Sequence, residues 1–229
     1  MLRRHQWNGC LDSLNIRLYA ATLLSGDSLP AWQRQLATEV LAELSLWDPT
    51  VCEAGAGLGL RALLDPVKWL ADLGSGRGWA ATDDANGASA RWRGIRQEIE
   101  GRSRLHSGWL AVAGRTDSIA HRVWNGQVAT LPLLERQRRE LLRSYRGLLR
   151  TPWTTPYGRI GRIEDLELNH IADQLAAQRS DGLRSTFEFV CWLRDMRNDL
   201  AHLEPIPATR VLEARFQSRL LQALAYEPE

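Results

Sequence analysis

The 229-residue sequence predicts an all-α protein, with a helical N-terminal region over 1–125 and an antiparallel helical bundle over 126–229. Apolar residues recur at spacings of three and four through most of the chain, which is the period of an amphipathic helix. Clusters of turn-forming residues separate these segments, and short links join the last three segments, as in antiparallel bundles. A hydrophobic content of 44% is enough to build a sizeable core.

The N-terminal region is predicted to contain four helices whose ends are marked by turn residues and prolines. Pro66 is expected to break or kink the third helix, because proline lacks a backbone donor. The segment 74–89 is rich in Gly, Ser, Asp and Asn, so it is predicted to be a loop. Residues 104–125 fit either strand or helix. The four predicted helices span residues 10–24, 31–47, 58–72 and 89–100.

The C-terminal bundle is predicted to consist of four helices, with a distinct linker after the first. This linker, residues 151–162, combines turn residues with aromatic and arginine side chains. Its Tyr157, Arg159 and Arg162 are candidates to stack RNA bases and hold phosphates, and the alternative is an ordinary packed surface loop. The four predicted helices span residues 130–150, 163–179, 183–200 and 208–226.

The most informative feature of the bundle is the stretch from Arg197 to His202, which is expected to close the third of these helices. Pro205 and Pro207 interrupt the backbone after it. An arginine stabilises charge that develops on a phosphate under attack, and a histidine transfers protons near neutral pH. With the polar Asn198 beside the arginine, this set suits metal-free cleavage of an RNA phosphodiester. The alternative is that the arginine and histidine are ordinary helix-end residues.

The segment 183–226 resembles the HEPN family, small helical bundles found in bacterial toxins, anti-phage effectors and CRISPR-associated ribonucleases. Active members carry Arg, a polar residue, a few variable positions and then His at a helix end, and Arg197, Asn198 and His202 match that pattern. The resemblance implies a homodimer in which two copies of the motif form one cleft. It also implies endoribonuclease activity without metal or cofactor, in which the 2′-hydroxyl attacks and the products are a 2′,3′-cyclic phosphate and a 5′-hydroxyl.

The resemblance also assigns a role to each motif residue. His202 is expected to act as general base or acid, Arg197 to bind the scissile phosphate, and Asn198 to orient one of these groups. Arg194 and Asp199 are weaker candidates that support them or contact RNA. A toxin or anti-phage effector of this kind is expected to have an inhibitor, such as an antitoxin, or an activating partner protein.

Two other functions compete with the ribonuclease. A HEPN-like bundle can serve only for binding or dimerisation within a multi-protein complex. The segment Ala71–Gly78 resembles the glycine-rich first motif of S-adenosylmethionine-dependent methyltransferases, which follows a strand and approaches the cofactor. That fold needs continuing β/α alternation, whereas the rest of this chain is predicted to be helical.

The resemblance to the HEPN family does not extend to one known mode of control. Glu204 stands where family toxins silenced by nucleotidylation carry a tyrosine, so that mode of control is not expected.

Composition and residue patterns limit the partners, metal content and compartment that are expected for the protein. A formal net charge of +2 and a pI near 8.6 do not suggest a general nucleic-acid coat protein, so the expectation of RNA as partner rests on the motif. The three cysteines are far apart and no residue spacing resembles a metal cage, so neither a disulfide framework nor a metal is expected. Without a secretory leader or a long apolar run, the protein is expected in the cytoplasm and not in a membrane.

Overall fold

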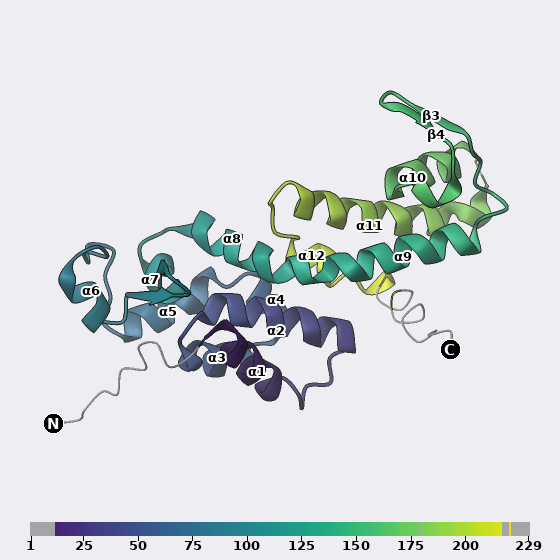
Figure 1. Ribbon diagram of the computed structural model, residues 1–229. Helices are drawn as coiled ribbons and strands as arrows, with labels where there is room; N and C mark the ends of the chain where they lie inside the picture. The colour runs from purple at the N-terminus through teal and green to yellow at the C-terminus, as the bar shows by residue number, and fades with distance from the viewer. Residues whose placement is uncertain (1–11, 179, 217–219, 221–229) are drawn as a thin grey trace. The chain divides into compact units, whose positions relative to one another are not determined.

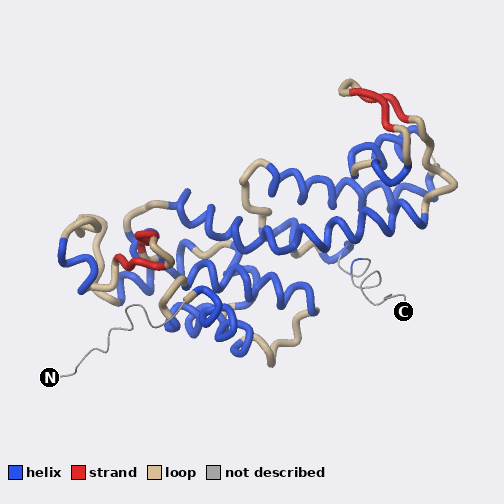
Figure 2. Tube along the Cα trace, in the orientation of Figure 1, coloured by secondary structure: helices blue, strands red, loops and turns tan. Residues whose placement is uncertain are grey.

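The structure, a computed structural model, describes residues 12–178, 180–216 and 220, which form mostly helix (Figure 1, Figure 2). The chain divides into two compact units, Met1–Ala129 and Thr130–Glu229. The prediction of a mainly helical protein is confirmed, and two short antiparallel hairpins are added to it. Within the described ranges, no helix is long and apolar enough to cross a membrane.

The first unit is centred on α2, which packs against α1, α3 and α8. The α2 side chains of Leu36, Val40, Leu41 and Leu44 are at most 1% exposed, and their spacing of three and four places them on the faces that these neighbours cover. The described elements of this unit are α1 (Ser13–Leu23), α2 (Ala31–Ser45), α3 (Pro49–Ala56), α4 (Gly59–Leu64), α5 (Val67–Gly76), α6 (Ala88–Trp92), β1 (Arg96–Ile99), β2 (Arg102–Leu105), α7 (Ser107–Val112) and α8 (Thr116–Gln127).

Two helix pairs in this unit approach closely at glycines. An added Cβ at Gly126 of α8 would lie 2.5 Å from the Val40 Cα on α2, and one at Gly74 of α5 would lie 2.5 Å from the Gly108 carbonyl oxygen on α7. A side chain at either position would force the helices apart. The glycine-rich segment that resembles a methyltransferase motif lies largely within α5 and does not follow a strand in the described chain. Its first glycine serves helix packing.

The second unit has its own core, formed where α10 packs against α11. Ile171, Val190 and Leu193 are fully buried there, and Leu134 of α9 is 2% exposed. The described elements are α9 (Leu131–Ser144), β3 (Trp153–Thr155), β4 (Gly158–Ile160), α10 (Leu168–Ala177), α11 (Arg184–Ala201) and α12 (Ala208–Val211), with 3₁₀ turns at Val128–Thr130, Ile163–Asp165 and Asp181–Leu183. The turn at Val128–Thr130 is where the chain passes from one unit to the next.

The prediction of a helix over 89–100 was wrong beyond its first residues, because the backbone turns twice. Gly94, with φ of 74°, follows the end of α6 and stops it. Glu100 and Gly101 both have positive φ, 50° and 71°, which is what a two-residue hairpin turn between β1 and β2 requires. The segment 104–125, for which the sequence allowed either strand or helix, contains α7 and most of α8.

The last predicted helix, 208–226, is also not continuous. Its first part, α12, ends at Val211, and residues 214–216 are helical again after an interruption. The indole N–H of Trp192 donates to the Arg210 carbonyl at 2.9 Å, which takes an acceptor that a continuing helix would use for the N–H four residues later. Residues 217–219 and 221–226 of this predicted helix lie outside the described residues.

Candidate functional site

The last two turns of α11 carry the motif residues at the protein surface. Arg197 and Asn198 are exposed on the helix, and His202 is the exposed residue that caps its C-terminus. The backbone N–H of His202 donates to the carbonyls of Asn198 at 3.0 Å and Asp199 at 3.2 Å. The motif histidine is therefore held through its backbone, and its side chain is accessible from solvent.

A residue in the left-handed conformation stops α11 directly after the motif. Leu203 has a φ of 62°, its N–H donates to the Leu200 carbonyl at 3.3 Å, and the Glu204 N–H donates to the Asp199 carbonyl at 2.9 Å. These two bonds form a Schellman motif, in which glycine is the usual left-handed residue. A leucine there costs about 1 kcal/mol of backbone strain. The backbone conformation that ends the helix at His202 is therefore one that leucine disfavours.

Arg197 forms an ion pair with Glu167, the residue that precedes α10. The Arg197 Nη2 and the Glu167 Oε2 are 3.1 Å apart, and the two side chains are 46% and 43% exposed. An ion pair this exposed contributes little to stability, because water screens both charges. Glu167 therefore neutralises the charge of the Arg197 guanidinium, and the guanidinium can still exchange this partner for another.

Arg138 on α9 anchors the segment that leads into Glu167. The Arg138 Nη1 donates to the carbonyls of Glu164 at 2.9 Å and Leu166 at 2.7 Å. Its Nε and Nη2 donate to the two carboxylate oxygens of Glu135 at 2.8 and 2.7 Å. This side chain is only 12% exposed and uses four of its five donors, so it fixes the segment before α10 to α9.

Beside Arg197 lies a cavity of about 180 Å³ within the second unit. Buried Leu134 and Leu168 are each 2% exposed, and Leu131, at 38%, is the most exposed of its three leucines. The charged lining residues are Glu135, Arg138 and Arg197. The sequence did not connect Glu135, Arg138 and Glu167 with Arg197, because they precede it by 62, 59 and 30 positions and carry no motif of their own.

Arg197 and His202 do not contact each other within one chain. Among the described residues no hydrogen bond or ion pair joins them, and five helical positions place two side chains about 140° apart around the axis. A single copy of the chain therefore presents the arginine and the histidine in different directions.

The two supporting candidates near the motif have other partners. Asp199 is ion-paired with Arg210 of α12, which ties the end of α11 to the next helix. Arg194 pairs with its neighbour Asp195 at 2.9 Å. Neither of these ion pairs includes His202.

The aromatic and arginine residues of segment 151–162 are carried by the β3–β4 hairpin, which projects from the second unit (Figure 1, Figure 2). Tyr157 at its tip is 99% exposed, and Arg159 is exposed on β4. Arg162 pairs with Asp165 at 3.3 Å after the hairpin. The hairpin lies apart from the C-terminal end of α11 in Figure 1, so the structure does not bring these three candidates together with Arg197 and His202.

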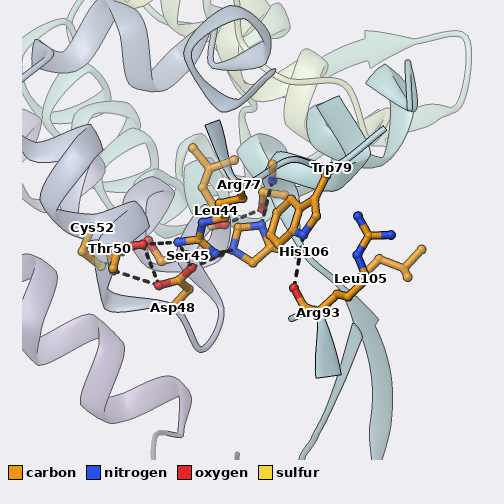
Figure 3. A network of polar contacts seen from close by, with 12 residues as sticks. Leu44, Ser45, Asp48, Thr50, Cys52, Arg77, Trp79, Arg93, Leu105 and His106 are labelled. Atoms are coloured by element: carbon orange, nitrogen blue, oxygen red, sulfur yellow. Dashed lines mark hydrogen bonds and ion pairs between the residues drawn. The ribbon is translucent and has the colours of Figure 1, made fainter. Parts of the chain in front are cut away.

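A buried polar network in the first unit was not predicted (Figure 3). The His106 imidazole is 1% exposed, and its Nε2 lies 2.9 Å from the Asp48 Oδ2. Its Nδ1 accepts a hydrogen bond from the Gly108 N–H at 3.0 Å. Arg77 lies 2.5 Å from the same Asp48 oxygen and its guanidinium stands over the Trp79 ring, 5.1 Å from its centre. Both imidazole nitrogens are occupied, so this network does not offer a free base.

The contacts within this network shift the pKa values of His106 and Asp48. Burial lowers the pKa of His106, and the hydrogen bond to Asp48 only partly opposes this effect. A lowered pKa agrees with the hydrogen bond that Nδ1 accepts, because an accepting nitrogen carries no proton. Burial would raise the pKa of Asp48, but the hydrogen bond from His106 and the charge of Arg77 hold it well below its usual range. Asp48 also caps α3 by accepting from the Thr50 N–H at 2.9 Å. The pair Asp48-Pro49, a cap followed by a proline at the first helical position, is the sequence signal that would have located it.

Among the described residues, no group of three or more His, Cys, Asp or Glu side chains is arranged to hold a metal ion. Comparison of the chain with protein-family models, with curated proteins and with solved structures found no match.

Proposed function

We propose that this chain is an endoribonuclease of the HEPN type that needs no metal, acts as a homodimer and works as a toxin or anti-phage effector under the control of an inhibitor or an activating partner. The observation that carries the proposal is the joint exposure of Arg197, Asn198 and His202 at one helix end. These residue types suit phosphodiester cleavage, and their exposure supports the proposal because a substrate strand has to reach them.

In the proposed reaction, His202 removes the proton of the 2′-hydroxyl. The 2′-oxygen forms a bond to phosphorus, the bond from phosphorus to the 5′-oxygen breaks, and an acid returns a proton to that oxygen. Arg197 releases Glu167 and pairs with the phosphate as negative charge develops on it. A second copy of the motif across a two-fold axis supplies the second proton-transfer group, which explains why one chain need not bring its own Arg197 and His202 together.

The test is cleavage of total RNA and tRNA in EDTA by purified wild type, Arg197→Ala and His202→Ala. Each alanine variant is expected to lose at least about 100-fold in rate, with 5′-hydroxyl and cyclic-phosphate ends on the wild-type products. Arg184→Ala, on the first turn of the same helix, and His121→Ala, in the first unit, are matched controls because both residues are exposed and distant in sequence from the motif. Equal cleavage by all variants would contradict the assignment.

The second candidate function is a binding or dimerisation module without catalysis. The Arg197–Glu167 ion pair favours it, because an arginine with a carboxylate partner is ordinary helix-end chemistry. A folded wild-type dimer that leaves RNA intact in EDTA and with its activating partner would support this function over the ribonuclease.

A further inference from the structure

The cavity beside Arg197 has the chemistry of a nucleobase site. Leu131 provides apolar surface for one face of a flat ring, the buried Leu134 and Leu168 form the apolar floor, and Glu135 and Arg197 supply polar groups for the edge of the ring and its phosphate. All of these residues belong to the second unit. A base enters such a cavity only when it is unpaired, because pairing and stacking hide its faces and edges.

The carboxylate of Glu135 defines which base edge fits. Its Oε1 accepts from Arg138 and Arg139, and its Oε2 accepts from the Arg138 Nε, which leaves acceptor capacity on Oε2. The hydrogen bonds from Arg138 and Arg139 lower the pKa of Glu135 to about 2, so the group is ionised and only accepts. An ionised carboxylate binds an exocyclic amino group and repels a carbonyl oxygen.

The side chains around the cavity are held in place before any ligand arrives. Arg138 is fixed by four hydrogen bonds to Glu135, Glu164 and Leu166, and it holds the Glu135 carboxylate in place at the edge of the cavity. Leu134 and Leu168 are packed in the core of the unit. Arg197 is the exception, since its partner Glu167 is itself 43% exposed and can be replaced by a phosphate.

We infer that the cavity beside Arg197 is a subsite for an unpaired nucleobase with an exocyclic amino group, whose adjoining phosphate pairs with the Arg197 guanidinium. The inference rests on the proposed function and names its substrate more closely as single-stranded RNA read at one base. Cytosine and uracil test it well, because they differ at one position, where cytosine carries an amino group and uracil a carbonyl oxygen.

The experiment measures the dissociation constants of cytidine and uridine monophosphates, each as the 3′- and the 5′-phosphate, by saturation-transfer NMR on the full-length protein. Ribose 5-phosphate serves as the probe without a base. Cytidine monophosphate is expected to bind about tenfold more tightly than uridine monophosphate or ribose 5-phosphate. Equal affinity for all three would overturn the inference.

Variants of two cavity residues test whether the nucleotides bind in the cavity. Leu131→Trp fills the mouth of the cavity and is expected to abolish the preference for cytidine, whereas Leu148→Trp is a matched control, because Leu148 is 39% exposed in the same unit and does not line the cavity. Glu135→Gln keeps the shape but can donate to uracil, so the preference is expected to vanish. A preference that persists at full strength in Leu131→Trp or in Glu135→Gln would overturn the inference.

The outcomes separate this inference from the proposed function. Cleavage that depends on Arg197 together with equal nucleotide binding would overturn the subsite and leave the ribonuclease standing. Selective cytidine binding without any cleavage would support the subsite and count against the enzyme.

Discussion

The proposed chemistry of the second unit depends on the ion pair that Arg197 forms. A guanidinium binds phosphate through its N–H groups, and in this protein the Arg197 Nη2 is already paired with the carboxylate of Glu167. Glu167 is held near it by the backbone contacts of Arg138 and by its own N–H, which donates to the His170 Nδ1 at 3.0 Å. Glu167 therefore competes with any phosphate for Arg197, and in the proposed mechanism RNA has to displace it.

Glu167→Gln is expected to tighten the binding of RNA, because glutamine keeps the size of the side chain and removes its charge. Exposed ion pairs contribute up to about 1 kcal/mol, so the gain in affinity should be about two- to fivefold. The measurement is the dissociation constant of a 2′-deoxy-substituted oligonucleotide, which lacks the attacking hydroxyl, at fixed salt.

Glu164→Gln is the control for that gain. Glu164 pairs with Arg146 at 3.2 Å, is 59% exposed and lies three positions earlier in the same segment. The two variants change the net charge equally, so a similar gain in both would mean that the effect comes from overall charge and not from Arg197.

Leu203→Gly should stabilise the second unit by about 0.5–1 kcal/mol, because glycine adopts the left-handed conformation without the strain that leucine carries. The leucine side chain is 60% exposed, so little buried surface is lost. The measurement is the free energy of unfolding in urea followed by circular dichroism. Leu203→Ala is the comparison, since alanine keeps the Cβ, and an equal gain from alanine would refute the backbone explanation.

Helix packing in the first unit depends on two glycines, and Gly74 can be tested against a neighbour. Gly74→Ala should destabilise the unit by about 1–3 kcal/mol, because the new Cβ would meet the Gly108 carbonyl of α7. Gly76→Ala, in the same helix, has no atom within 4 Å of its new Cβ and should change stability by less than about 0.5 kcal/mol. Tryptophan fluorescence during urea unfolding suits this unit, because eight of the ten tryptophans precede residue 130.

The buried Asp48–His106 pair makes the first unit sensitive to acid. The pKa of His106 is lowered in the folded state, so the unfolded chain binds a proton first and stability falls as pH drops below about 6.5. The pKa of Asp48 is lowered too, and its contribution is lost below about pH 4. Arg77 and Arg122 add positive charge that further disfavours protonated His106.

This pH dependence is measured by urea unfolding at several pH values between 5 and 8, with tryptophan fluorescence as the signal. In His106→Gln the loss of stability between pH 6.5 and 5 should be much smaller than in wild type, whatever the stability at pH 8. His121→Gln should retain the wild-type slope, because His121 is exposed. An unchanged slope in His106→Gln would assign the acid sensitivity to other groups.

The sequence predicts elements well where one strong signal controls them. The apolar stripe of α2 and the proline before α5 define those helices with little help from the rest of the chain. The β1–β2 turn and the end of α12 could not be predicted, since they depend on positive φ at Glu100 and on the indole of Trp192, which comes from another helix. The motif at 197–202 was visible in the sequence, but its partner Glu167 is brought near only by folding.

At the scale of the whole molecule, the proposed mechanism requires a pair of chains. A mass near twice 25.9 kDa is therefore expected in sedimentation-velocity experiments at micromolar concentration. A strictly monomeric wild type that still cleaves RNA would remove the need for a composite cleft and require another second proton-transfer group.

The β3–β4 hairpin also makes one peptide bond unusually vulnerable. Tyr157 is 99% exposed at its tip and is followed by Gly158, a sequence that chymotrypsin can cut, and exposed hairpin tips are preferred sites of nicking. Brief digestion of the native protein should divide the chain between these residues while α9, α10 and α11 keep the fragments together. The same position is a natural place to open the chain for new termini, or to insert a peptide tag, without disturbing the end of α11.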